Sequence, residues 1–151
     1  MSTLKVDTYL TRGGASEIAI DKLKGVTAAG SMLVVAEGGT TTTSLQQGLV
    51  KMWSTVEMNN SNNIPDSFNS SGITDNGNGT PQFIFINNMA AAGSYVLAGA
   101  GHDGTFVCQH AAAGDSRTTH MLTSSVKTRS RGHDGGVDDG HHMVLITGDL
   151  A

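Results

Sequence analysis

Histidine and aspartate side chains, which could bind a ligand or a metal ion, are concentrated in the last third of the sequence. The tripeptide His-Asp-Gly occurs twice, at 102–104 and 133–135, and Asp-Asp-Gly-His-His follows at 138–142. Neutral imidazole and carboxylate are good ligands for zinc and other transition metals. The candidate ligand-binding residues are therefore His102, Asp103, His133, Asp134, His141 and His142.

Two interpretations of these residues stay open. In the first, the histidines hold a metal ion. A single histidine near the axis of an oligomer would then be enough, because every copy contributes the same side chain. In the second, the glycine-rich loops are exposed turns, the histidines lie on the surface, and the protein has no cofactor. Calcium is not favoured, because Asp134, Asp138 and Asp139 do not follow the EF-hand spacing. Bound metal and melting temperature, measured with and without a chelator, would decide between them.

No arrangement typical of an enzyme occurs in the sequence. It contains neither Gly-x-Ser-x-Gly nor His-Glu-x-x-His, and no glycine pair begins a phosphate-binding loop. A pair of aspartates for glycoside cleavage would have to be assembled in space from the late loops. The one cysteine, Cys108, excludes an intrachain disulfide and lies in a strand-like run, which is typical of a small buried hydrophobe. We predict that the chain is not an enzyme and has no catalytic residues.

The composition favours a protein that is stabilised by association. Only 15% of the 151 residues are charged and 5% are aromatic, whereas 20 are glycine. Fewer large side chains bury less apolar surface, so contacts between subunits would have to supply stability. The net charge of -4 provides no basic surface for nucleic acid. No apolar run approaches the ~20 residues that a membrane helix needs, and no signal peptide is recognised, so we expect synthesis in the cytoplasm.

Short apolar or alternating segments, separated by Gly, Asn and Ser clusters, predict strands throughout the chain. The Asn-Gly repeat at 75–79 predicts a hairpin turn, and the Asn/Ser cluster at 59–63 predicts another turn. The run at 32–36 is expected to be a buried strand, and the run at 49–56, which carries the single tryptophan, a strand of the core. Strands are predicted at 4–10, 17–20, 32–36, 49–56, 67–73, 82–86, 95–98, 106–109, 119–126 and 143–147.

The flexible polar segment near 37–47 suggests a boundary between two parts. Residues 1–46 are predicted to be a short extended N-terminal segment for attachment and oligomerisation. Residues 47–151 are predicted to be a distal all-β domain. Its seven or so short strands are typical of a β-sandwich-like fold or a small barrel.

Two stretches together resemble a family of phage proteins. They are Leu-Gln-Gln-Gly-Leu-x-Lys-x-Trp at 45–53 and Asp-Ser-Phe-Asn with Thr-Asp-Asn-Gly-x-Gly at 66–79, and the first eight residues are similar too. The family comprises tail-fibre and virion structural proteins of tailed phages, many of marine or cyanobacterial hosts. The resemblance covers roughly residues 1–10 and 40–100. It implies a homotrimeric fibre whose N-terminal part joins the subunits, with a β-structured distal domain and no enzymatic activity.

The resemblance implies a virion protein, made in the cytoplasm of a bacterial host, that contributes to host attachment as a short tail fibre or a fibre-like appendage. The alternative is a capsid-surface decoration protein or a neck or tail joining protein that stabilises the particle. Expected partners are further copies of the chain, other virion proteins of tail or capsid, and a host surface glycan, but neither nucleic acid nor a membrane. The loops expected to bind a glycan are 59–63, 101–104, 111–117 and 129–142.

Overall fold

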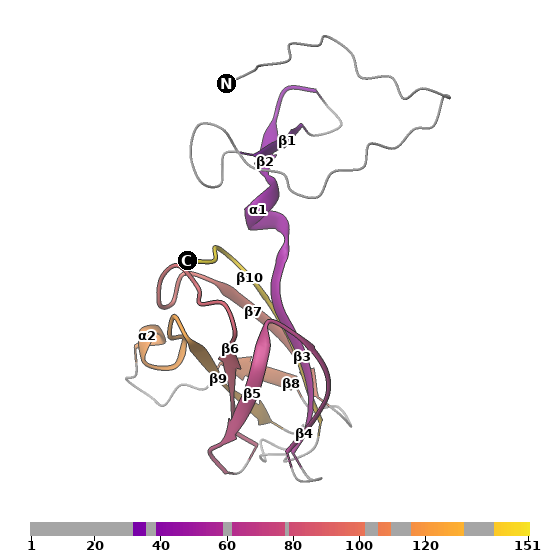
Figure 1. The fold of residues 1–151 in the computed structure, drawn as a ribbon, viewed down its shortest axis with the longest axis vertical. Helices are drawn as coiled ribbons and strands as arrows, with labels where there is room; N and C mark the ends of the chain where they lie inside the picture. Colours follow the sequence, from indigo (N-terminus) through magenta and orange to yellow (C-terminus); the bar gives the residue numbers. More distant parts are fainter. Residues whose placement is uncertain are drawn as a thin grey trace, which may run out of the picture.

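Strands dominate the structure, a computed structural model that describes residues 32–35, 39–58, 62–77, 79–101, 106–109, 116–131 and 141–151. The all-β prediction is confirmed for this part of the chain. A body of two sheets carries a projecting two-stranded arm (Figure 1). Among the described residues no helix is long and apolar enough to span a membrane.

The arm pairs β1 (Leu33–Val35) with β2 (Thr42–Ser44) in antiparallel register. The one-turn helix α1 (Leu45–Gly48) follows at once and joins the arm to the body. Its N-cap is Ser44, whose side chain accepts a hydrogen bond from the backbone N–H of Gln47 at 3.4 Å. The polar segment that suggested a boundary thus ends in this arm and helix.

The body consists of two four-stranded antiparallel sheets. The first has the order β4-β3-β10-β7, with bounds β4 (Asn63–Phe68), β3 (Val50–Glu57), β10 (His141–Thr147) and β7 (Val96–Gly101). The second has the order β5-β6-β9-β8, with bounds β5 (Ser70–Asp75), β6 (Pro81–Phe85), β9 (Ser125–Arg131) and β8 (Phe106–Gln109).

Alternation along the strands directs one face of each sheet into a shared core. On β10 the buried residues are His142, Val144 and Ile146, while their neighbours are partly or fully exposed. The large apolar side chains of this core come from both sheets and from the segments beside them: Met52, Val56, Phe83, Phe85, Met89, Tyr95, Met121, Val126, Val144 and Ile146. Tyr95 packs edge-on against Phe85, with ring centroids 5.9 Å apart.

The chain crosses from the first sheet to the second at Asn69. This residue has φ +56°, a left-handed conformation that asparagine tolerates better than most side chains. Its buried amide nitrogen donates to the carbonyls of Lys51 and Asn87 at 2.8 and 3.1 Å. Its amide oxygen accepts from the backbone N–H of Asn87 at 2.6 Å. Asn69 therefore ties the corner to strand β3 and to the segment after β6.

The predicted Asn-Gly turn is confirmed between β5 and β6. Gly77 and Gly79 both have positive φ, and the Asp75 carboxylate accepts from the Gly77 N–H at 2.7 Å. The barrel alternative is wrong, because no hydrogen-bonded ladder joins β7 to β8 within the described residues. No ladder joins β4 to β5 either, so the described strands form a sandwich-like body of two separate sheets.

Three strand predictions need correction. The expected strand at 67–73 is broken by the turn of the chain at Asn69 into β4 and β5. The expected strand at 119–126 begins instead in the short helix α2 (Arg117–His120), which is capped by Ser116. Residues 121–124 form a turn, and only the last two residues of the expected strand belong to β9. The run at 32–36 does contain a strand, but β1 is exposed rather than buried. The strands expected at 4–10 and 17–20 lie outside the described residues.

Candidate functional site

Of the six predicted ligand-binding residues, the structure describes two. His102, Asp103, His133 and Asp134 lie outside the described residues, so the ligand prediction around them stays a prediction. His141 and His142 are consecutive in β10 and therefore point to opposite faces of the sheet. One ion cannot take both rings from this strand. Within the described residues no group of three or more His, Cys, Asp or Glu could hold a metal ion.

His141 lies on the outer face of the first sheet at its polar end. Its Nε2 atom is 3.5 Å from a carboxylate oxygen of Glu57, the residue directly across the ladder on β3. Both residues line a depression of about 560 Å³ together with Thr55, Pro65 and Met143. The predicted loops 101–104 and 129–142 begin or end beside this depression, because Gly101 and His142 also line it.

His142 belongs to a polar part of the interior that the sequence patterns did not reveal. Its side chain is fully buried, as are those of Ser54 on β3 and of Thr128 and Ser130 on β9. The Thr128 hydroxyl donates to the carbonyl of Pro81 at 3.4 Å. Serine and threonine in strands are usually assigned to the solvent face, so their types alone do not indicate that these residues are buried.

The outer face of the first sheet is apolar over much of its width. Cross-strand register puts Phe68, Trp53, Leu145 and Ala98 in one row, because directly paired residues share a face. The next row holds Thr55, Met143 and Ala100, with Asp66 at its end. We call Phe68, Trp53, Leu145, Ala98, Met143 and Ala100 the outer apolar face.

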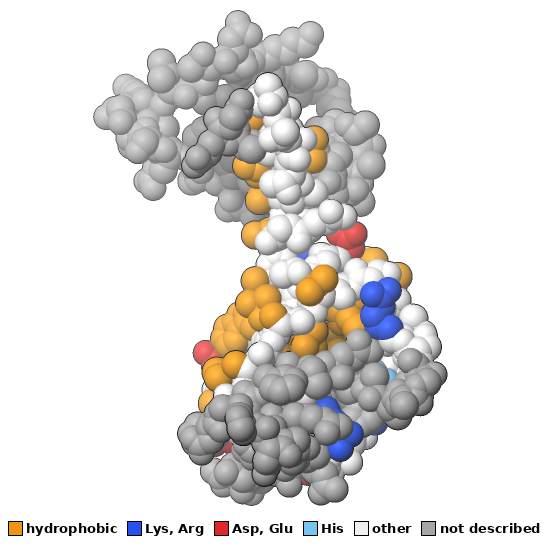
Figure 2. Space-filling view, turned by 180° about the vertical axis from the view of Figure 1, so that it is seen from behind, with side chains coloured by type: hydrophobic (Ala, Val, Ile, Leu, Met, Phe, Trp, Pro, Cys, Tyr) orange, Lys and Arg blue, Asp and Glu red, His pale blue; other side chains and the backbone are white. Residues whose placement is uncertain are grey.

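The outer apolar face is exposed in the single chain. Phe68, Met143 and Leu145 retain 51, 45 and 40% of their accessible surface, and Trp53 is half-buried. Figure 2 shows hydrophobic side chains gathered on the back of the body as it is drawn in Figure 1. With Val96 and Val50 at its margin, the face presents roughly 500 Å² of apolar surface, as large as the biggest patch of a typical monomer (about 300–600 Å²).

The arm is the second exposed apolar element. All three residues of β1, Leu33, Val34 and Val35, are 44 to 58% exposed, and Leu49 just after α1 is exposed as well. A two-stranded ribbon alone is marginally stable in water, because it buries too little apolar surface. The arm therefore lacks, within the described residues, the packing partner that its composition calls for.

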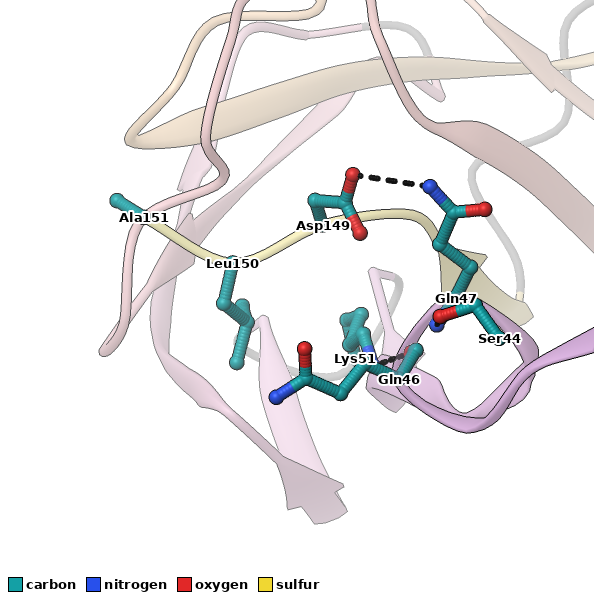
Figure 3. Close-up of a pocket in the computed structure, with 7 residues that line it drawn as sticks. All are labelled: Ser44, Gln46, Gln47, Lys51, Asp149, Leu150 and Ala151. Carbon is teal, nitrogen blue, oxygen red and sulfur yellow. Dashed lines mark hydrogen bonds between the residues drawn. The ribbon is translucent and has the colours of Figure 1, made fainter. Parts of the chain in front are cut away.

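A cleft of about 520 Å³ lies where the arm joins the body (Figure 3). It is bounded by α1 on one side and by the segment after β10 on the other, and the Gln47 side chain donates to the Asp149 carboxylate at 3.3 Å. The buried Lys51 ammonium donates to the carbonyl of Gln46. These contacts connect the helix to the body at the base of the arm.

Comparison with known protein families, with curated proteins and with solved structures finds no match for this chain. The functional argument therefore rests on the residues and their geometry. Among them, the outer apolar face and the arm are the features that a stable isolated domain does not need.

Sequence reasoning identified β3, most of β10 and the first half of β7, but neither β4 nor the exposure of the outer apolar face. Trp53 was assigned to the core, yet it projects outward while Met52 and Ser54 on either side point inward. The signal was present in Met143-Val144-Leu145-Ile146, a run without alternation. A strand that is apolar on both faces needs cover on both faces.

Proposed function

We propose that this chain is a non-catalytic structural protein of a tailed-phage particle, a short tail fibre or fibre-like appendage that works as a homotrimer and contributes to host attachment. The observation that carries the proposal is the projecting arm, whose apolar strand β1 has no packing partner in the described part of a single chain. Association with other copies would cover it.

The resemblance to phage fibre proteins supports the same proposal. The stretch 45–53 that carries it forms α1 and the first half of β3, and the stretch 66–79 forms the corner at Asn69 and the β5–β6 turn. These segments connect the arm to the body and the two sheets to each other. In a fibre, residues 1–46 would join the subunits, and residues 47–151 would form the distal domain.

The oligomer is tested by the mass of the purified full-length protein. Light scattering should give a particle near three times 15.6 kDa, and the particle should withstand mild heating in detergent. Val34→Asp, which puts a charge on the arm, should shift the mass toward one chain. A wild-type chain that remains monomeric and folded over the whole accessible concentration range would overturn the fibre proposal.

The second candidate function is a decoration or joining protein that stabilises the particle, and the outer apolar face favours it if a different virion protein covers that surface. Removal of the protein from the phage separates the two functions. Loss of a fibre should leave stable particles that adsorb poorly to host cells. Loss of a decoration protein should leave particles that adsorb normally but break on heating or at low ionic strength.

A further inference from the structure

We infer that the outer apolar face of the first sheet is where the bodies of neighbouring copies of this chain meet. This inference rests on the proposed homo-oligomer and adds the surface and its central residue. It concerns the body, whereas the proposed function rests on the arm.

The centre of the face carries no charge. The row of Phe68, Trp53, Leu145 and Ala98 is wholly apolar, and the row beside it is interrupted only by the Thr55 hydroxyl, which donates to the carbonyl of Asp66 at 3.2 Å. Charged groups lie at the margin, at Asp66 and at the His141–Glu57 pair. An apolar centre with a polar margin is the usual anatomy of an interface between proteins.

The area argues for a second copy as the partner. The face alone, roughly 500 Å², falls short of the ~800 Å² that each partner contributes to a stable interface of standard size. The exposed arm residues, Leu33 to Val35 and Leu49, add roughly 350 Å², which brings one chain to that value. Face and arm belong to the same chain, so a partner with the same two surfaces can cover both at once.

The path of the chain connects these two surfaces. Leu49 and Val50 are both exposed, and they follow α1 directly and lead into β3, which carries Trp53 to the middle of the face. Figure 2 shows hydrophobic side chains along the arm and on the body in a single view. Copies arranged around an axis along the length of the molecule would therefore bury arm and face together.

Trp53 provides a direct test, because it is the single tryptophan of the chain and lies within the face. The mass and the tryptophan emission of the wild-type protein are measured together over a dilution series. As the oligomer dissociates, the emission maximum should move to longer wavelength and quenching by acrylamide should increase at least twofold. Emission that stays constant while the mass falls would overturn the inference and leave the homo-oligomer intact.

A matched pair of variants completes the experiment. Leu145→Arg introduces a charge at the centre of the face, and Leu122→Arg introduces one before β9 of the other sheet; the two leucines are 40 and 38% exposed. Leu145→Arg should weaken association at least a hundredfold with unchanged circular dichroism, and Leu122→Arg should associate like wild type. If Leu145→Arg associates normally while the arm variant Val34→Asp does not, the fibre proposal stands and the face inference fails. A monomeric wild type with exposed Trp53 would overturn both.

Discussion

The corner residue Asn69 offers the sharpest test of how this fold is held together. Replacement by alanine removes the amide that donates to the carbonyls of Lys51 and Asn87 and accepts from the Asn87 N–H. It also forces alanine to adopt φ +56°. Replacement by glycine removes the same hydrogen bonds, but glycine adopts this positive φ without strain. The two variants therefore separate the hydrogen bonds from the backbone strain.

The expected magnitudes follow from these contacts. Buried backbone groups that lose their partner cost about 1–3 kcal/mol each, so the loss of this network should cost about 2–4 kcal/mol. The left-handed conformation adds about 1 kcal/mol for alanine. We expect Asn69→Ala to lower the free energy of unfolding by about 3–5 kcal/mol, which is a large part of the 5–15 kcal/mol typical of a domain. Asn69→Gly should lose about 1 kcal/mol less.

Asn62 is the matched control, because it has the same φ of +56° but its side chain, among the described residues, donates to the exposed Asp75 carboxylate rather than to buried backbone. Asn62→Ala should cost about 1 kcal/mol and Asn62→Gly close to nothing. Urea unfolding followed by circular dichroism measures all four variants at one fixed protein concentration, so that the proposed association would affect each variant alike. If Asn69→Ala loses no more than Asn62→Ala, the corner network does not stabilise the fold as argued.

Three further predictions concern the buried Tyr95 and its neighbour Gly148. Tyr95→Phe should lower the free energy of unfolding by about 1–2 kcal/mol at pH 7, because the Tyr95 hydroxyl donates to the carbonyls of Leu122 and Ser125 at 3.0 and 3.1 Å. Burial raises the pKa of the Tyr95 hydroxyl above its ordinary value of 10.0, so the unfolded chain releases this proton at a lower pH than the folded chain. The free energy of unfolding should therefore fall as the pH rises above 10. Between pH 7 and pH 10.5 the urea midpoint should fall less in Tyr95→Phe than in wild type. Gly148→Ala should cost about 1–3 kcal/mol, because the new Cβ would lie 2.7 Å from Cβ of Tyr95. Gly48→Ala, where nothing lies within 4 Å, should change the thermal midpoint little, and equal midpoints for both alanine variants would contradict the argument.

The sequence predicted the fold class and many of the strands, because their patterns are local. Short apolar runs located β6 and β10, and turn chemistry located the turn at Gly77, without tertiary information. The corner at Asn69 was missed, because nothing in the polar segment around it distinguishes a left-handed asparagine from one in a strand. The helix α2 was missed because four residues around Thr118 and Thr119 also suit a strand, and the Ser116 cap decides between the two.

The candidate surfaces were harder to predict than the strands. Period-two patterning assigns residues to one face or the other, but it does not say which face is covered when both are apolar, as at Met52 and Trp53. It also assigns polar residues outward, although Ser54 and Thr128 point inward. His141 and His142 were identified as a pair from their chemistry, whereas the pleat of β10 separates them. Which side chains point inward depends on which strands are neighbours, and local sequence patterns do not determine strand order.

The order of strands in the first sheet also determines when this sheet can form during synthesis. Strand β3, the first of the body, is paired along its length with β10, the last, and the register joins Trp53 to Leu145. Contacts between such distant segments form late, because the chain between them must be closed into a loop first. During synthesis the first sheet therefore cannot be completed until residue 147 has left the ribosome. Met143 and Leu145 of the outer apolar face belong to that same strand, so a growing chain lacks the finished surface until β10 has paired with β3.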